Sequence, residues 1–108
     1  MPGAKIVKAV VLLNQTTYSG TPVPFYTPPD SGLFRVFVYC GGTGVSSIAV
    51  DFTDDNGSGQ EAEFDTGVIV RSATCRQKAG IPITYTLGDG GSPYNFSVYI
   101  VLEKLELD

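Results

Sequence analysis

The stretch that decides the fold runs from residue 33 to residue 53 and reads LFRVFVYCGGTGVSSIAVDFT. On each side of its glycine cluster, apolar side chains recur at every second position. In the first half they are Phe34, Val36, Val38 and Cys40, and in the second half they are Ile48, Val50 and Phe52. A period of two is typical of a strand with one buried face. The stretch therefore predicts two strands, over residues 33–40 and 45–53, separated by a break at residues 41–44.

Strand patterns continue outward from this stretch, at residues 5–13, 61–75, 81–87 and 94–105. Gly67 marks a bulge or a break within the least regular of them. Residues 21–29 contain four prolines, so they predict an extended edge or a loop that crosses the sandwich. With 108 residues, the chain predicts one domain over residues 1–108. The predicted fold class is all-β, a jelly-roll-like antiparallel β-sandwich of about seven to eight strands.

Composition excludes several classes of function. The chain has no His and no Trp, so the commonest general base and zinc ligand are missing. The net charge is −4 and the seven basic residues are scattered, which argues against nucleic-acid binding. No apolar run has the length of a membrane span or of a signal peptide. We expect a non-enzymatic protein without a cofactor, made in the cytoplasm, that binds neither nucleic acid nor membrane.

The two cysteines, Cys40 and Cys75, are too few for a structural zinc site. Two reduced, buried side chains are the favoured interpretation, and one disulfide is the alternative.

A calcium-loop spacing occurs in the turn region that follows residue 53. Counted from Asp54, the side chains with ligand oxygens are Asp54, Asn56, Ser58 and Asp65. The flanking segments read as strands rather than helices, and the last position holds Asp instead of a bidentate Glu. A hairpin turn therefore explains the spacing better than a metal site does.

The last strand pattern is apolar on both faces, and the first is partly so at residues 7–12. A sandwich buries only one face of each strand, so the second face needs another cover. We expect a partner copy to supply it, with Leu33, Phe37, Tyr99 and Val101 as subunit-interface candidates; cover by the chain's own loops is the alternative.

A family resemblance begins at residues 25–36, FYTPPDSGLFRV, which resemble an element of the tumour-necrosis-factor and complement-globular-head jelly rolls. Phe34 stands where many of those relatives have Tyr. Residues 78–85, KAGIPITY, and residues 94–103, YNFSVYIVLE, are similar to small virion proteins of phages and prophages. The resemblance implies a homotrimer at a bacteriophage virion surface, as capsid decoration or tail appendage, with other virion proteins as further partners. The alternative function is a carbohydrate-binding β-sandwich module that uses exposed Tyr and loop Asp and Asn residues to bind a glycan.

Overall fold

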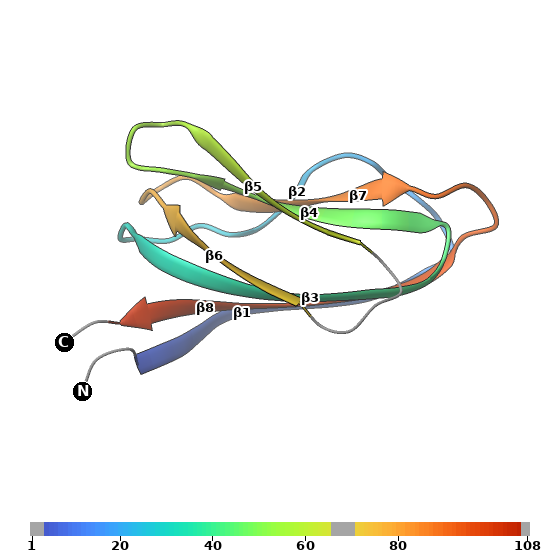
Figure 1. Cartoon of the computed structure of the whole chain (residues 1–108), viewed down its shortest axis with the longest axis horizontal. Coiled ribbons are helices and arrows are strands. Elements are labelled where there is room, and N and C mark those ends of the chain that lie inside the picture. The colour runs from blue at the N-terminus through green and yellow to red at the C-terminus, as the bar shows by residue number, and fades with distance from the viewer. Residues whose placement is uncertain (1–3, 66–70, 107–108) are drawn as a thin grey trace.

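The computed structural model describes residues 4–65 and 71–106, which form eight strands in two sheets (Figure 1). The strands are β1 (Ala4–Gln15), β2 (Val23–Tyr26), β3 (Gly32–Thr43), β4 (Val45–Thr53), β5 (Gly59–Asp65), β6 (Arg71–Gln77), β7 (Ile83–Asp89) and β8 (Asn95–Glu106). The described residues hold no helix of the length and hydropathy that a membrane span requires. The prediction of an all-β fold is confirmed.

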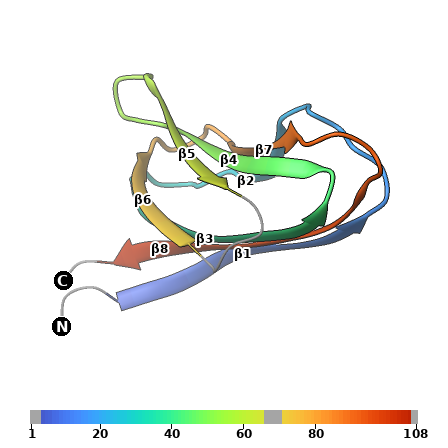
Figure 2. The ribbon, with the colours of Figure 1, turned by 45° about the vertical axis from the view of Figure 1, so that its right-hand side comes forward.

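The two sheets lie face to face, and all their strand pairs are antiparallel (Figures 1 and 2). The β1 sheet has the order β1-β8-β3-β6, and the β2 sheet has the order β2-β7-β4-β5. Only β4 and β5 are neighbours both along the chain and within a sheet, so most connections cross from one sheet to the other. This nested order is the double Greek key of a jelly roll, which confirms the predicted architecture.

The core lies between the sheets and contains the alternating apolar positions expected from the sequence. Those on β3 and β4 are all buried, namely Phe34, Val36, Val38, Cys40, Ile48, Val50 and Phe52. The inward positions of β8 join them as Phe96, Val98, Ile100 and Leu102. Burial of each such side chain stabilises the fold by about 1.5–3 kcal/mol before entropy costs are counted. The core faces predicted for β3 and β4 are therefore confirmed.

The single strand expected over residues 61–75 is wrong, because β5 and β6 are separate strands in opposite sheets. Ala62 and Phe64 of β5 pack into the core, and so do Ala73 and Cys75 of β6. The first pair has even numbers and the second has odd numbers, so one unbroken strand could not bury both. Gly67, expected to mark a bulge or break, lies outside the described residues.

The strand break expected at residues 41–44 is misplaced, because β3 continues to Thr43. Gly41 and Gly42 stay in the ladder and pair with Ser97 and Phe96 of β8. Gly42 has a φ of 109°, and a Cβ there would collide with the backbone of Asn95 and Phe96. These glycines therefore permit a close approach of two strands, and the chain turns only at Gly44.

The two thiols are free, as the favoured interpretation predicted, but Cys40 is buried whereas Cys75 is half-buried. Cys75 pairs with Phe34 across the β3–β6 ladder, whereas Cys40 lies six residues further along β3. Six residues of a strand span about 20 Å, and a disulfide requires Cα atoms within about 7 Å. The strand register therefore excludes a disulfide between them within one chain.

Burial raises the pKa of the Cys40 thiol from 9.0 to about 11. As the pH rises from 9.0 to about 11, Cys40 loses its thiol proton in the unfolded chain before it does so in the folded chain. We therefore expect the free energy of unfolding to fall by about 2 kcal/mol between pH 9.0 and about pH 11. Urea titrations across this range measure the change, and Cys40→Ala serves as the control. An equal fall in Cys40→Ala would contradict the assignment to this thiol.

Candidate assembly face

The outward surface of the β1 sheet carries apolar side chains on adjacent strands. Residues directly opposite each other in neighbouring strands point to the same side of a sheet. One such row consists of Val10 of β1, Val101 of β8 and Phe37 of β3. The next row consists of Leu12, Tyr99 and Tyr39. We call this surface the apolar face, and define it by Val7, Val10, Leu12, Leu33, Phe37, Tyr39, Tyr99 and Val101.

Most of these side chains are open to solvent. Leu12 is 68% exposed, Val10 is 57% exposed, and Tyr39 and Tyr99 are each 41% exposed. Monomeric proteins rarely expose contiguous apolar patches larger than a few hundred Å². Exposure of this kind along three neighbouring strands makes this surface a candidate for contact with another molecule.

The area of this side of the sheet suits a protein partner. β1, β3 and β8 have 12 residues each and β6 has 7. At about 3.3 Å per residue and about 4.8 Å between strands, the surface measures roughly 700 Å². A stable interface of standard size buries about 800 Å² on each partner. The β1 sheet therefore offers nearly all the area that such an interface needs.

The four interface candidates from the sequence lie together on this surface. Phe37, Tyr99 and Val101 occupy the two central rows, and Leu33 follows on β3 opposite Arg76 of β6. Whether they form an interface stays a prediction. The candidates did not include Leu12 or Tyr39. The sequence pattern could have identified both residues. Tyr39 lies two positions after Phe37 on the same side of the strand, and Leu12 belongs to a strand that is partly apolar on both faces.

A polar pair borders the apolar rows. Arg35 of β3 lies opposite Glu103 of β8, and the Arg35 guanidinium carbon is 5.6 Å from the centre of the Phe37 ring. Oε1 of Glu103 is buried and has no hydrogen-bond partner among the described residues. Buried polar atoms are nearly always paired in native proteins.

The outward surface of the β2 sheet has the opposite character. Asp51 of β4 lies opposite Glu61 of β5, and Glu63 and Asp65 continue the same side of β5. The Asp51 carboxylate is the main reason that the pKa of Glu61 is raised, with burial and Glu63 adding to it. The two outward surfaces of the sandwich therefore differ, since one is apolar and the other is acidic.

The calcium-loop residues do not converge. Oδ1 of Asp54 accepts hydrogen bonds from the backbone N–H groups of Asn56 and Ser58, both at 2.9 Å. Asp65 lies at the far end of β5, six residues and about 20 Å of strand beyond Gly59. Within residues 4–65 and 71–106, no three acidic, Cys or His side chains gather closely enough to hold a metal ion. Asp54, Asn56 and Ser58 serve the β4–β5 turn.

No protein-family model matches the chain, and no curated protein matches it by sequence. Among solved structures, the chain is similar to a subunit of Bacillus endospore appendages, described as a novel family of disulfide-linked pili. That match has 16% identity and a TM-score of 0.51, and it covers 100% of this chain and 95% of the other. A second match is to a Clostridium thermocellum xylanase 10B structure of CBM22-1 and GH10 modules with xylohexaose. It has 13% identity and a TM-score of 0.33, and covers 94% of this chain and 24% of the other.

The first similarity shows a shared β-sandwich fold, because 16% identity carries no more than that. The resemblance to phage virion proteins stays a prediction.

Proposed function

We propose that the protein is a non-enzymatic structural subunit that assembles with copies of itself through the apolar face. The observation that carries the proposal is the exposure of Val10, Leu12, Tyr39 and Tyr99 in adjacent strands of one sheet. Covering such side chains stabilises an assembly by about 25 cal/mol per Å² of apolar area, before association costs are subtracted.

Charge favours another copy of the chain as the occupant and sets its orientation. The chain carries a net charge of −4, and the acidic row from Asp51 to Asp65 lies on the β2 sheet. Two copies that met through that surface would bring like charges together. Arg35 and Glu103, one basic and one acidic residue, lie side by side next to the apolar face, so the same pair on a second copy can complement them. Contact through the β1 sheet keeps the acidic surfaces apart and in water.

The fold similarity supports an assembly role, since the solved structure with a TM-score of 0.51 belongs to a pilus. The narrower form of the proposal is a homotrimer at a bacteriophage virion surface, in capsid decoration or a tail appendage, with other virion proteins as partners. This form rests on the sequence resemblance of residues 78–85 and 94–103. The wider form of the proposal, self-assembly, rests on the apolar face and does not depend on the sequence resemblance.

The test is the mass in solution between about 1 and about 100 µM chain. We expect the wild type to associate, because the apolar face is covered only in the assembly. Leu12→Glu is expected to weaken the association at least tenfold, since it buries an unpaired charge. Leu12 is exposed, so the variant should still fold.

Asn56→Asp is the matched control, because it adds the same charge in the exposed β4–β5 turn, away from the apolar face, and Asn56 donates to Asp54 only through its backbone N–H. A wild type that stays at 11.5 kDa would overturn the proposal, and so would equal effects of the two variants. An assembly of two chains, or of more than three, would keep the wider form and reject the trimer.

The alternative is carbohydrate binding, and one observation favours it. Tyr39 and Tyr99 lie opposite each other on neighbouring strands, and both rings are partly exposed. Such a pair can stack against sugar rings. A glycan array tests it with the wild type and Tyr99→Ala. Binding by a monomer that is lost in Tyr99→Ala would support this alternative, and a silent array would reject it.

A further inference from the structure

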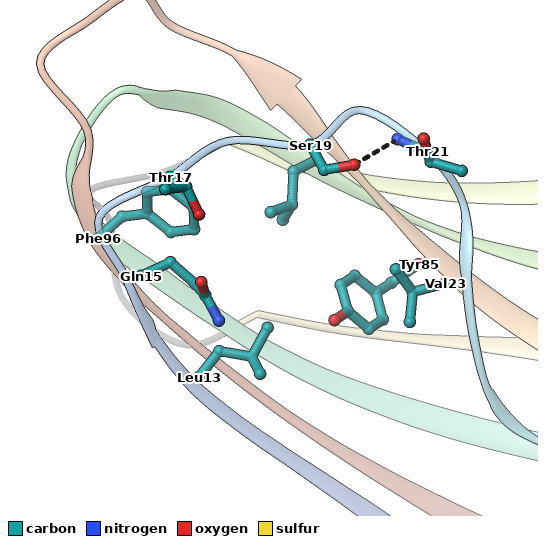
Figure 3. A pocket seen from close by; sticks show the side chains of 9 residues that line it. Leu13, Gln15, Thr17, Ser19, Thr21, Val23, Tyr85 and Phe96 are labelled. Carbon is teal, nitrogen blue, oxygen red and sulfur yellow. Dashed lines mark hydrogen bonds between the residues drawn. The ribbon is translucent and has the colours of Figure 1, made fainter.

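A pocket opens between the two sheets, on the side where β1 and β2 form the sheet edges (Figure 3). Its volume is about 190 Å³. Leu13 and Gln15 of β1 and Phe96 of β8 line it from one sheet, and Tyr85 of β7 lines it from the other. The β1–β2 connection, residues 16–22, passes across its mouth. The pocket lies on the inner side of the β1 sheet, so it is independent of the apolar face.

Specific contacts hold the walls of the pocket in place. The Tyr18 hydroxyl in the β1–β2 connection donates a hydrogen bond to the Leu87 carbonyl oxygen of β7, at 2.8 Å. The Tyr18 ring also stacks on Tyr94, with 5.5 Å between the ring centres. The Phe25 ring of β2 packs against the Tyr85 ring, with 5.9 Å between their centres. These contacts tie the connection to β7 and fix the tyrosine that faces the pocket, so the space is preformed.

The body of the pocket is apolar. Side chains from both sheets supply this surface, namely Leu13, Val23, Leu87 and Phe96. Leu87 and Phe96 belong to the buried core, whereas Val23 lies at the edge of its sheet. A flat apolar group placed between these walls would contact one sheet on each side, as the core side chains do.

One deep polar group faces this apolar space. Tyr85 is only 6% exposed, and within residues 4–65 and 71–106 its hydroxyl makes no hydrogen bond. Figure 3 shows the Tyr85 ring extending into the pocket with its hydroxyl leading, opposite the side chains of Gln15 and Thr17. The other polar groups are the hydroxyls of Ser19 and Thr21 at the mouth. None of the lining side chains carries a charge, so the pocket suits a neutral ligand.

The volume sets the size of that ligand. An apolar cavity of about 150 Å³ holds a benzene molecule. The pocket, at about 190 Å³, therefore holds one six-membered ring and one or two further heavy atoms. A sugar of this size would place several hydroxyls against Leu13, Leu87 and Phe96, where they would lose their hydrogen bonds to water. A ring with a single hydroxyl matches the one deep polar partner.

We propose that this pocket binds a small, neutral, phenol-like compound, with its ring between the two sheets and its hydroxyl on Tyr85. The walls supply the apolar contacts, and the Tyr85 hydroxyl both accepts and donates hydrogen bonds. A bare hydrocarbon would leave the Tyr85 hydroxyl and the Gln15 amide without a hydrogen-bond partner. Such unpaired polar groups lower the affinity, so the pocket favours a ligand with a hydroxyl.

The experiment is an NMR titration with p-cresol up to about 10 mM, with toluene as the ligand that lacks only the hydroxyl. We expect saturable shifts centred on Leu13, Val23 and Leu87. Tyr85→Phe is expected to weaken p-cresol binding about fivefold and to leave toluene binding unchanged, because it removes one hydrogen bond and keeps the ring. Tyr39→Phe is the matched control, since its hydroxyl lies on the outward side of the β1 sheet, away from the pocket, and both ligands should bind it as they bind the wild type.

A second variant tests the place of binding independently of Tyr85. Thr17→Trp places a bulky ring at the exposed mouth and is expected to abolish binding of both ligands. Three results would overturn the proposal: no saturable shift at these residues, an equal loss for toluene in Tyr85→Phe, or tighter binding of glucose than of p-cresol at the same residues.

Discussion

Phe34→Ala is expected to lower the free energy of unfolding by about 4 kcal/mol. The Phe34 side chain is fully buried in the middle of the β1 sheet, where β3 pairs with both β8 and β6. Its ring centre lies 6.1 Å from that of Tyr26 on β2, so it also joins the two sheets. The substitution removes these contacts and leaves a cavity that the surrounding strands cannot close, because their backbones are hydrogen-bonded on both sides. Urea denaturation measures the loss.

Phe37→Ala is the matched control for this prediction, because Phe37 lies on the same strand but points outward. At chain concentrations where the protein is monomeric, we expect its cost to be below about 1.5 kcal/mol, since the site is already partly in water. Equal losses in the two variants would mean that the core does not lie where β3 places it. A larger loss for Phe37→Ala only at high concentration would agree with the apolar face as an interface.

Gln77→Ala is expected to lower the free energy of unfolding by about 3 kcal/mol, mainly because it removes two buried hydrogen bonds. Gln77 is a fully buried polar residue at the end of β6. Its Oε1 accepts a hydrogen bond from the Thr53 N–H at 2.6 Å, and its Nε2 donates one to the Ile81 carbonyl oxygen at 2.6 Å. One side chain therefore links the end of β4 to the β6–β7 turn. Alanine would leave both backbone groups buried without a partner.

Gln77→Glu separates this explanation from a simple loss of volume. A carboxylate still accepts from Thr53, but it has no proton for the Ile81 carbonyl oxygen and it buries a charge. We expect a loss near neutral pH that shrinks as the pH falls toward about 4, where the protonated side chain donates again. Lys78→Ala, at the exposed neighbouring position, should leave stability within about 0.5 kcal/mol. A pH-independent loss in Gln77→Glu would argue against the hydrogen-bond link.

The sequence predicted the faces of the strands better than their order. Alternation over residues 33–40 and 45–53 identified the core side of β3 and β4, because that pattern follows from which side chains must leave water. The same pattern says nothing about neighbours, since any two strands with apolar faces can pair. One feature of the sequence could have indicated that residues 61–75 form two strands. The inward apolar positions change from even numbers at Phe64 to odd numbers at Ala73.

For the candidate sites too, the sequence showed which face of a strand a residue lies on but not which strands lie side by side. Tyr99 and Val101 could be selected from the sequence, because an apolar residue in the wrong phase of a strand is visible without a structure. The pocket could not, since it combines parts of β1, β2, β7, β8 and the β1–β2 connection. Gln15, Thr17, Ser19 and Thr21 read as ordinary polar turn residues. Only the fold shows that they lie beside Tyr85, 64 or more positions later in the chain.

The pairing of β1 with β8 has a practical consequence for protein engineering. Ala4 lies opposite Glu106, so the backbone enters and leaves the sandwich at adjacent points, about 5 Å apart. A host protein could therefore carry residues 4–106 as an insert in a surface loop without its own loop ends being forced apart. Such a chimera would display the sandwich on a short double stalk, which leaves the opposite end of the molecule pointing away from the host.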